Sequence, residues 1–217
     1  MKTRQFVAVI AAGLLAAACQ KPKPEAAAAN AAAPAAPAAQ PAPADSLPRV
    51  VLETTKGRIV MQLDRTRAPR SVDNIVEHVN AHFYDGLVFH RVIPGFMIQA
   101  GVLTAAGMEK LSSAPPVPNE ADNGLKNVRG AVALARTYDP QSGGVQFYIN
   151  VADNPSLDFK AKTVEGWGYA VIGRVVEGME VAIRISTVPT TVHGAAYANL
   201  PVEPVIITKA YVDTAAK

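Results

Sequence analysis

One segment of the chain combines a permanent cation and a carboxamide with an apolar, strand-like run. Residues 89–101 read FHRVIPGFMIQAG, so Arg91 and Gln99 stand among large apolar side chains. Arginine stays protonated and carries a rigid fork of donors, and burying it without a partner is costly. The segment therefore predicts a shallow apolar pocket with a fixed hydrogen-bond donor at its edge.

Several familiar catalytic devices are incomplete in this sequence. His78 and His82 lie four residues apart near a predicted helix end, but the stretch HVNAH lacks the glutamate of the zinc-protease motif. Ser142 lacks the Gly-x-Ser-x-Gly frame of a nucleophile elbow. The glycines of residues 166–173 do not form a dinucleotide fingerprint. We therefore expect no metal, no cofactor and no covalent nucleophile.

Residues 89–101 also resemble the signature segment of the cyclophilins, which are peptidyl-prolyl cis-trans isomerases. The resemblance extends from Arg49 to about Asp213 and is most similar to the bacterial branch of the family. It is densest in four blocks, at residues 89–101, 119–135, 146–158 and 166–175. It implies an eight-stranded antiparallel barrel with two helices and an active groove on the outer face.

Rotation about an X-Pro bond breaks no covalent bond, so the lack of a nucleophile excludes little. Amide resonance gives this rotation a barrier of ~18–20 kcal/mol. In the twisted transition state the prolyl nitrogen becomes pyramidal and regains a lone pair, which a donor can hydrogen-bond. Each ~1.4 kcal/mol of selective stabilisation there gives a tenfold higher rate. A guanidinium at the lip of an apolar proline pocket suits this role.

The resemblance assigns the chemistry to two residues of the first block. Arg91 matches the catalytic arginine of the family. Gln99 is expected to hold the substrate backbone and to help orient the guanidinium. His90 is expected to support the site, although a core histidine is an equally good interpretation.

The resemblance also implies an apolar proline pocket and a wall that binds the residues before proline. Tyr148 stands where many members have phenylalanine, and Tyr169 stands in for a pocket histidine. The positions that match the pocket are Phe96, Met97, Tyr148 and Leu157, and those that match the wall are Ala135, Arg136 and Gln146.

Three other interpretations stay open at this point. Arg91 could be a structural arginine held in a salt bridge. The domain could be a chaperone module that grips Pro-containing segments without turnover. The chain could also be a structural envelope lipoprotein whose important part is its tether. The presence of both Arg91 and Gln99 favours the isomerase.

The secondary-structure pattern is mainly β. Pro69 suits a first helical position, and Val72, Ile75, Val76 and Val79 follow at the spacing of an amphipathic helix. A second, shorter helix fits residues 178–185. Short β-rich runs occupy residues 49–54, 58–63, 87–93, 96–101, 131–135, 146–151, 170–175 and 205–212.

Many short strands with only two helices favour a barrel or a sandwich over β-α-β units. Closure removes sheet edges, and two amphipathic helices can cover the open ends. We predict a closed eight-stranded antiparallel β-barrel capped by two α-helices, formed by one domain over residues 47–217. A sandwich would give similar runs.

The N-terminus has the features of a bacterial lipoprotein signal. Lys2 and Arg4 precede an apolar stretch that is shorter than the ~20 residues needed to cross a bilayer. Small residues stand directly before Cys19, the only cysteine in the sequence, as in a lipobox. We predict that residues 1–18 are a signal peptide and that Cys19 is lipidated. An ordinary signal peptide with an incidental cysteine is the alternative.

Residues 19–46 are rich in alanine and proline and predict an extended tether. Its Ala/Pro-rich part, residues 22–44, has a reach of at most roughly 80 Å. Removal of Lys2 and Arg4 with the signal lowers the formal net charge from +3 to +1. This charge, without a basic stripe, gives no support for nucleic-acid binding. We expect Pro-containing polypeptides as partners and a monomeric chain. Gln20 resembles lipoproteins of the outer membrane, whose periplasmic face is the expected location.

Overall fold

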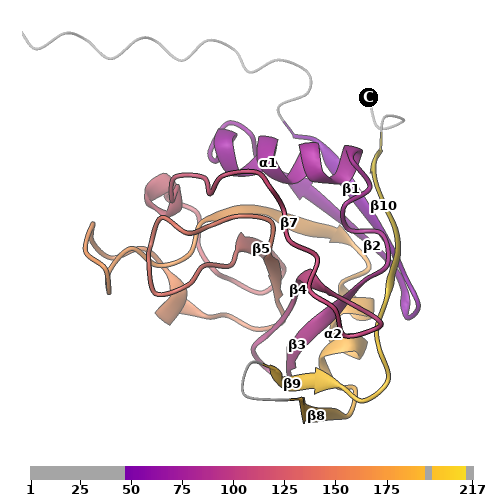
Figure 1. Ribbon diagram of the computed structural model, residues 1–217. Coiled ribbons are helices and arrows are strands. Elements are labelled where there is room, and N and C mark those ends of the chain that lie inside the picture. The colour runs from indigo at the N-terminus through magenta and orange to yellow at the C-terminus, as the bar shows by residue number, and fades with distance from the viewer. Residues whose placement is uncertain (1–46, 194–196, 214–217) are drawn as a thin grey trace, which may run out of the picture. The chain divides into compact units, whose positions relative to one another are not determined.

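The fold is dominated by one eight-stranded antiparallel sheet (Figure 1). The computed structural model describes residues 47–193 and 197–213. The strand order is β10-β1-β2-β7-β5-β6-β4-β3. The strands are β1 (Arg49–Thr54), β2 (Gly57–Leu63), β3 (Leu87–Ile93), β4 (Met97–Thr104), β5 (Ala131–Leu134), β6 (Phe147–Asn150), β7 (Val171–Glu177) and β10 (Ile207–Asp213).

The two outer strands of this order meet and nearly close the sheet into a barrel. Val88 of β3 forms an isolated bridge with Ile206, just before β10. The Phe89 amide donates to the Val205 carbonyl at 3.0 Å, and the Gly86 amide donates to a carbonyl of β10 at 2.8 Å. The predicted eight-stranded antiparallel barrel is therefore confirmed, with this short seam as its closure.

Two helices contribute apolar faces to the barrel core. Helix α1 (Pro69–Asn80) packs against β10, and α2 (Met179–Ser186) packs against β2, β3 and β4. They lie on opposite sides of the barrel in Figure 1. Their buried core residues are Val72, Ile75 and Val79 on α1, and Val181, Ala182 and Ile185 on α2. The predicted pair of capping helices is confirmed.

The first turn of α1 is capped from a distant loop. Ala68 at the N-cap offers no side-chain acceptor. The Glu120 carboxylate instead accepts from the backbone amides of Arg70 and Ser71, at 3.2 and 2.9 Å. A carboxylate at this end of a helix also interacts favourably with the helix dipole. This contact ties the segment before the short helix η1 (Ala121–Asn123) to α1.

Sequence patterning missed a second, two-stranded sheet formed by β8 (Thr190–His193) and β9 (Tyr197–Pro201). The two strands are short and partly exposed, so they lack the alternation of apolar and polar residues that marks a half-buried strand. Tyr197 and Leu200 of β9 pack on a small apolar cluster with Val102 and Leu103. β4 runs to Thr104, beyond the predicted end at residue 101, because its last residue pairs with Leu87 of β3.

The predicted signal peptide, Cys19 and the tether over residues 19–46 lie outside the described residues. Within the described ranges, no helix has the length and apolar character needed to span a membrane.

Candidate active site

One row of side chains crosses five neighbouring strands on the outer face of the barrel. The residues that alternate with this row, such as Val92, Ile98 and Ile149, point into the core. Because paired residues of adjacent strands share a face, the register aligns the predicted catalytic and pocket positions directly. The row runs Arg91 (β3), Gln99 (β4), Tyr148 (β6), Ala133 (β5) and Val171 (β7).

The same face carries an apolar cluster that is separate from the barrel core. Its buried members include Met97, which is 1% exposed, and Tyr148, which is 4% exposed. Six other residues pack around them while remaining partly accessible, and these are Ile93, Phe96, Leu125, Ala135, Leu157 and Tyr169. All four predicted pocket residues thus belong to one surface cluster, with Tyr148 and Met97 as its floor.

Arg91 stands at the edge of this cluster with its donors free. The side chain is exposed, and its guanidinium carbon lies 6.0 Å from the centre of the Phe96 ring. Within residues 47–193 and 197–213 no hydrogen bond or ion pair holds the guanidinium. Because Arg91 is exposed, it does not carry the cost of burial that the sequence suggested. The alternative of a structural arginine held in a salt bridge is not supported, because Arg91 has no acidic partner in the described part of the chain.

Gln99 lies beside Arg91 in the register but contacts a different residue. Its amide nitrogen donates to the side-chain oxygen of Gln146 at 3.0 Å. No hydrogen bond joins Gln99 to the guanidinium in the described structure, so the expected orienting contact is not made. Two cavities of about 470 Å³ each meet at this glutamine pair. One extends past Ala135 and Arg136, and the other past His90 and Arg91.

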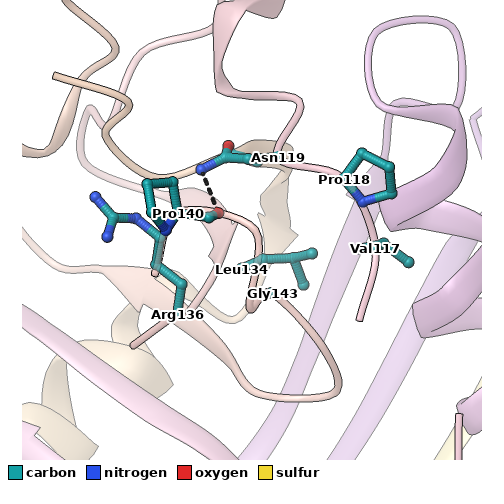
Figure 2. A pocket seen from close by; sticks show the side chains of 8 residues that line it. Val117, Pro118, Asn119, Leu134, Arg136, Pro140 and Gly143 are labelled. Carbon is teal, nitrogen blue, oxygen red and sulfur yellow. Dashed lines mark hydrogen bonds between the residues drawn. The ribbon is translucent and has the colours of Figure 1, made fainter. Parts of the chain in front are cut away.

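Arg136 is held by the loop that precedes β7. Its Nε donates to the Gly168 carbonyl at 2.8 Å, and its guanidinium carbon lies 4.7 Å from the centre of the Tyr169 ring. Figure 2 shows Arg136 beside a small cavity, where the Asn119 side chain donates to the Pro140 carbonyl at 3.0 Å. These contacts connect the predicted wall to the pocket through Tyr169.

Comparisons with known proteins address what this face does. The family model described as cyclophilin-type peptidyl-prolyl cis-trans isomerase matches residues 49–212. The chain belongs to the cyclophilins. It is 50% identical over 161 residues to peptidyl-prolyl cis-trans isomerase A of Dickeya dadantii, covering 74% of this chain and 82% of the relative. It is 44% identical over 158 residues to isomerase B of Escherichia coli, covering 73% and 95%. The predicted family and its isomerase class are confirmed.

Solved cyclophilin structures share this fold. A Cryptosporidium parvum cyclophilin, crystallised in the presence of the dipeptide Ala-Pro, superposes with a TM-score of 0.62 at 22% identity and covers 76% of this chain and 99% of its own. A cyclophilin from Hirschia baltica gives a TM-score of 0.58 at 26% identity and covers 75% and 72%.

Sequence analysis missed one residue that organises the pocket of this cyclophilin. Asn127 is 2% exposed, and its side-chain oxygen accepts from the Tyr148 hydroxyl at 2.8 Å. Its side-chain nitrogen donates to the Leu157 carbonyl at 3.2 Å and to the Tyr169 carbonyl at 3.5 Å. One carboxamide therefore connects the floor of the cluster to two of its walls. The signal in the sequence was the extra hydroxyl of Tyr148, which needs a partner when buried.

His90 is nearly buried beside Arg91 and lines the cavity on that side of the glutamine pair. It is 4% exposed, and its ring meets Tyr197 edge-on with centroids 5.8 Å apart. Burial, and secondly the charge of Arg91, lower the pKa of His90 to about 4. The imidazole is therefore neutral at pH 7 and supplies no titrating proton near that pH.

The lowered pKa of His90 predicts a loss of stability in acid. Below the ordinary pKa of ~6.5 the unfolded chain takes up a proton at His90 that the folded chain does not, until the pH reaches about 4. The free energy of unfolding should fall by roughly 3 kcal/mol over this window because of this group. Urea unfolding at pH 7 and pH 4.5 measures the fall. The His90→Gln variant should lose much less stability between these pH values, and an equal fall in both proteins would contradict the prediction.

Proposed function

We propose that the protein accelerates cis-trans rotation about X-Pro bonds and that Arg91 stabilises the twisted prolyl nitrogen. One observation carries the proposal: an exposed guanidinium with free donors stands at the edge of a separate apolar cluster, in the same row as Gln99 and Tyr148. Membership of the cyclophilins supports the reaction.

The geometry suits a substrate with its proline ring on Phe96, Met97 and Leu157. The ring would cover apolar surface that water otherwise contacts. The planar ground-state amide nitrogen offers no lone pair to a donor, because resonance delocalises it. The pyramidal nitrogen of the transition state does offer one. A donor fixed at the rim therefore binds the transition state better than the ground state, which is the requirement for catalysis.

The remaining polar groups orient the substrate without changing protonation. The Gln99–Gln146 pair stands between two cavities, so a polypeptide laid across it would have room on both sides. Their amide groups can exchange hydrogen bonds with a peptide backbone. Arg91 and these amides act as hydrogen-bond donors and acceptors without proton transfer, so catalysis needs no acid–base pair.

The test is exchange between cis and trans isomers of an Ala-Pro peptide, measured by NMR with and without the protein. We expect the uncatalysed exchange, which takes tens to hundreds of seconds, to become much faster at micromolar protein. The alternative is a chaperone module that only binds Pro-containing segments. Peptide binding without faster exchange would support that module and reject the isomerase.

We further propose that the enzyme works on proteins of the cell envelope, held to a membrane through lipidated Cys19. The support is the apolar N-terminal stretch, the small residues before this cysteine and the Ala/Pro-rich residues 19–46. The outer membrane and a monomeric state stay predictions. Labelling with a radioactive fatty acid should mark the intact chain and not the Cys19→Ala variant. Equal labelling of both would reject the anchor.

A further inference from the structure

A second groove lies on the outer face of the barrel, next to the apolar cluster of the active site. It has a volume of about 620 Å³ and crosses β2, β7 and β5, where the register places Gln62, Arg174 and Ala131 in one row. Ala131 and Val171 belong both to its lining and to the apolar cluster. We call it the basic groove, defined by Lys126, Val128, Arg129, Ala131, Val171 and Arg174.

Its rim carries an excess of positive charge. Lys126, Arg129 and Arg174 are exposed. Only the Lys126 side chain forms an ion pair among the described residues, with the Asp158 carboxylate at 3.8 Å, and it is still 57% exposed. The Asp153 carboxylate accepts from the backbone amide of Arg129 and not from its guanidinium. The one acid in the lining, Asp64, already accepts from the amides of Thr66 and Arg67. The two arginines therefore offer free donor forks, which match carboxylates in geometry.

The floor between these cations is apolar and is formed by small or buried side chains. Ala131 and Val171 are each 4% exposed, and Val128 at the rim is 51% exposed. Gly173 contributes no side chain, and a Cβ there would lie 2.2 Å from the Gln62 carbonyl oxygen. The groove thus combines a shallow apolar surface with cations on its rim. Its chemical complement is an extended peptide that has both apolar and acidic side chains.

We propose that the basic groove binds an acidic segment of the same polypeptide whose proline occupies the site beside Arg91. This inference rests on the proposed function, because it places the segment in a substrate. The predicted wall for residues before proline lies at the Ala135 end of β5, whereas the groove lies at the Ala131 end. The groove therefore faces residues that follow the proline.

The register also gives the spacing. From Tyr148 on β6 to Arg174 on β7 there are two steps between strands, roughly 10 Å, and an offset of two residues along β5, roughly 7 Å. The separation is therefore roughly 12 Å, which about four extended residues span. Leu125 lies between the two sites, since it packs on the apolar cluster and also lines the groove. A peptide that crosses Leu125 would bring an acidic block that begins about four residues after the proline to the cations of the groove.

The test compares peptides with one Ala-Pro bond that differ only in a three-residue block. The first peptide has three Glu residues after the proline, the second has three Gln residues there, and the third has three Glu residues before the proline. We expect the Glu block after the proline to lower KM about five- to tenfold relative to Gln, with kcat unchanged, because several weak ion pairs add up. The gain should vanish in 0.5 M salt, where exposed charges are screened.

The variant that tests the groove is the pair Arg129→Gln and Arg174→Gln in the full chain. It should lose the preference for Glu and keep the turnover of the Gln peptide. Lys209→Gln, which removes an exposed cation on β10, is the matched control and should keep the preference. Equal KM for Glu and Gln peptides would overturn the proposal, as would an equal gain from a block before the proline.

Two further outcomes separate this inference from its alternatives. The first outcome is that the protein binds vesicles of anionic phospholipid, that the double variant does not bind them, and that Glu peptides are not preferred. This outcome would assign the groove to a membrane and overturn the proposal. If no peptide exchanges faster than without protein, the proposed function fails. Binding to the groove is then tested separately, by NMR. The Glu peptide, but not the Gln peptide, should shift the signals of Arg129 and Arg174, and the absence of a shift would overturn the groove proposal.

Discussion

Replacing Arg91 by alanine should lower kcat/KM for an Ala-Pro peptide by about 10²- to 10³-fold, with little change in peptide affinity. Removing one fixed donor from a transition-state charge typically has this effect, which corresponds to ~3–4 kcal/mol of lost stabilisation. The proline ring would still bind, because Phe96 and the floor of the cluster stay in place. The loss should therefore appear in kcat rather than in KM.

The folded state should tolerate this substitution. Arg91 is exposed and makes no hydrogen bond or ion pair within the described ranges, so alanine leaves no buried group unpaired. The Arg91→Lys variant keeps the charge but loses the planar fork of donors, and we expect it to recover only part of the activity.

The matched control is Arg58→Ala, which removes a half-exposed arginine paired with Glu53 at 3.8 Å, in the β1–β2 hairpin away from the row. It should keep kcat/KM within a factor of about two, as surface substitutions commonly do. If Arg91→Ala kept a third or more of the original kcat/KM, the donor would lie elsewhere. The apolar pocket alone would then have to account for any catalysis.

Part of the grouping of side chains on this face could be predicted because Arg91, Phe96 and Gln99 lie close together in the chain. Arg91 and Gln99 flank a single turn, and antiparallel pairing of β3 with β4 brings them opposite each other. Tyr148 joins the same row through β6, because the predicted run at residues 146–151 matches this strand to within one residue at each end. Alternation of core and surface residues along each strand was thus enough to bring these side chains to one face.

Other features depend on long-range contacts that patterning does not reveal. Nothing in the residues around position 127 indicates that an asparagine there joins Tyr148 to Leu157, since the bonds come from segments about twenty and thirty residues away. The basic groove likewise arises because β7 lies between β2 and β5, which is a matter of strand order. The capping of α1 by Glu120 spans fifty positions.

The Asn127→Ala variant should show the second large effect, a loss of about 2–4 kcal/mol in the free energy of unfolding. The carboxamide is buried and bonds the Tyr148 hydroxyl, the Asn150 side chain and the Leu157 carbonyl. Each buried polar group left without a partner costs about 1–3 kcal/mol. Some bonds remain, since Asn150 also donates to the Ala131 carbonyl at 3.1 Å. Urea unfolding measures the loss.

The same variant should also raise KM for Ala-Pro peptides several-fold, because the ring of Tyr148 loses the bond that fixes it under the proline. A double-mutant cycle with Tyr148→Phe separates this role from general destabilisation. Without the hydroxyl, part of what Asn127 does is already gone, so Asn127→Ala should cost less stability and change KM less when it is combined with Tyr148→Phe. Fully additive effects on both quantities would mean that the bond between Asn127 and Tyr148 does not shape the pocket, and that the asparagine only ties the loops together.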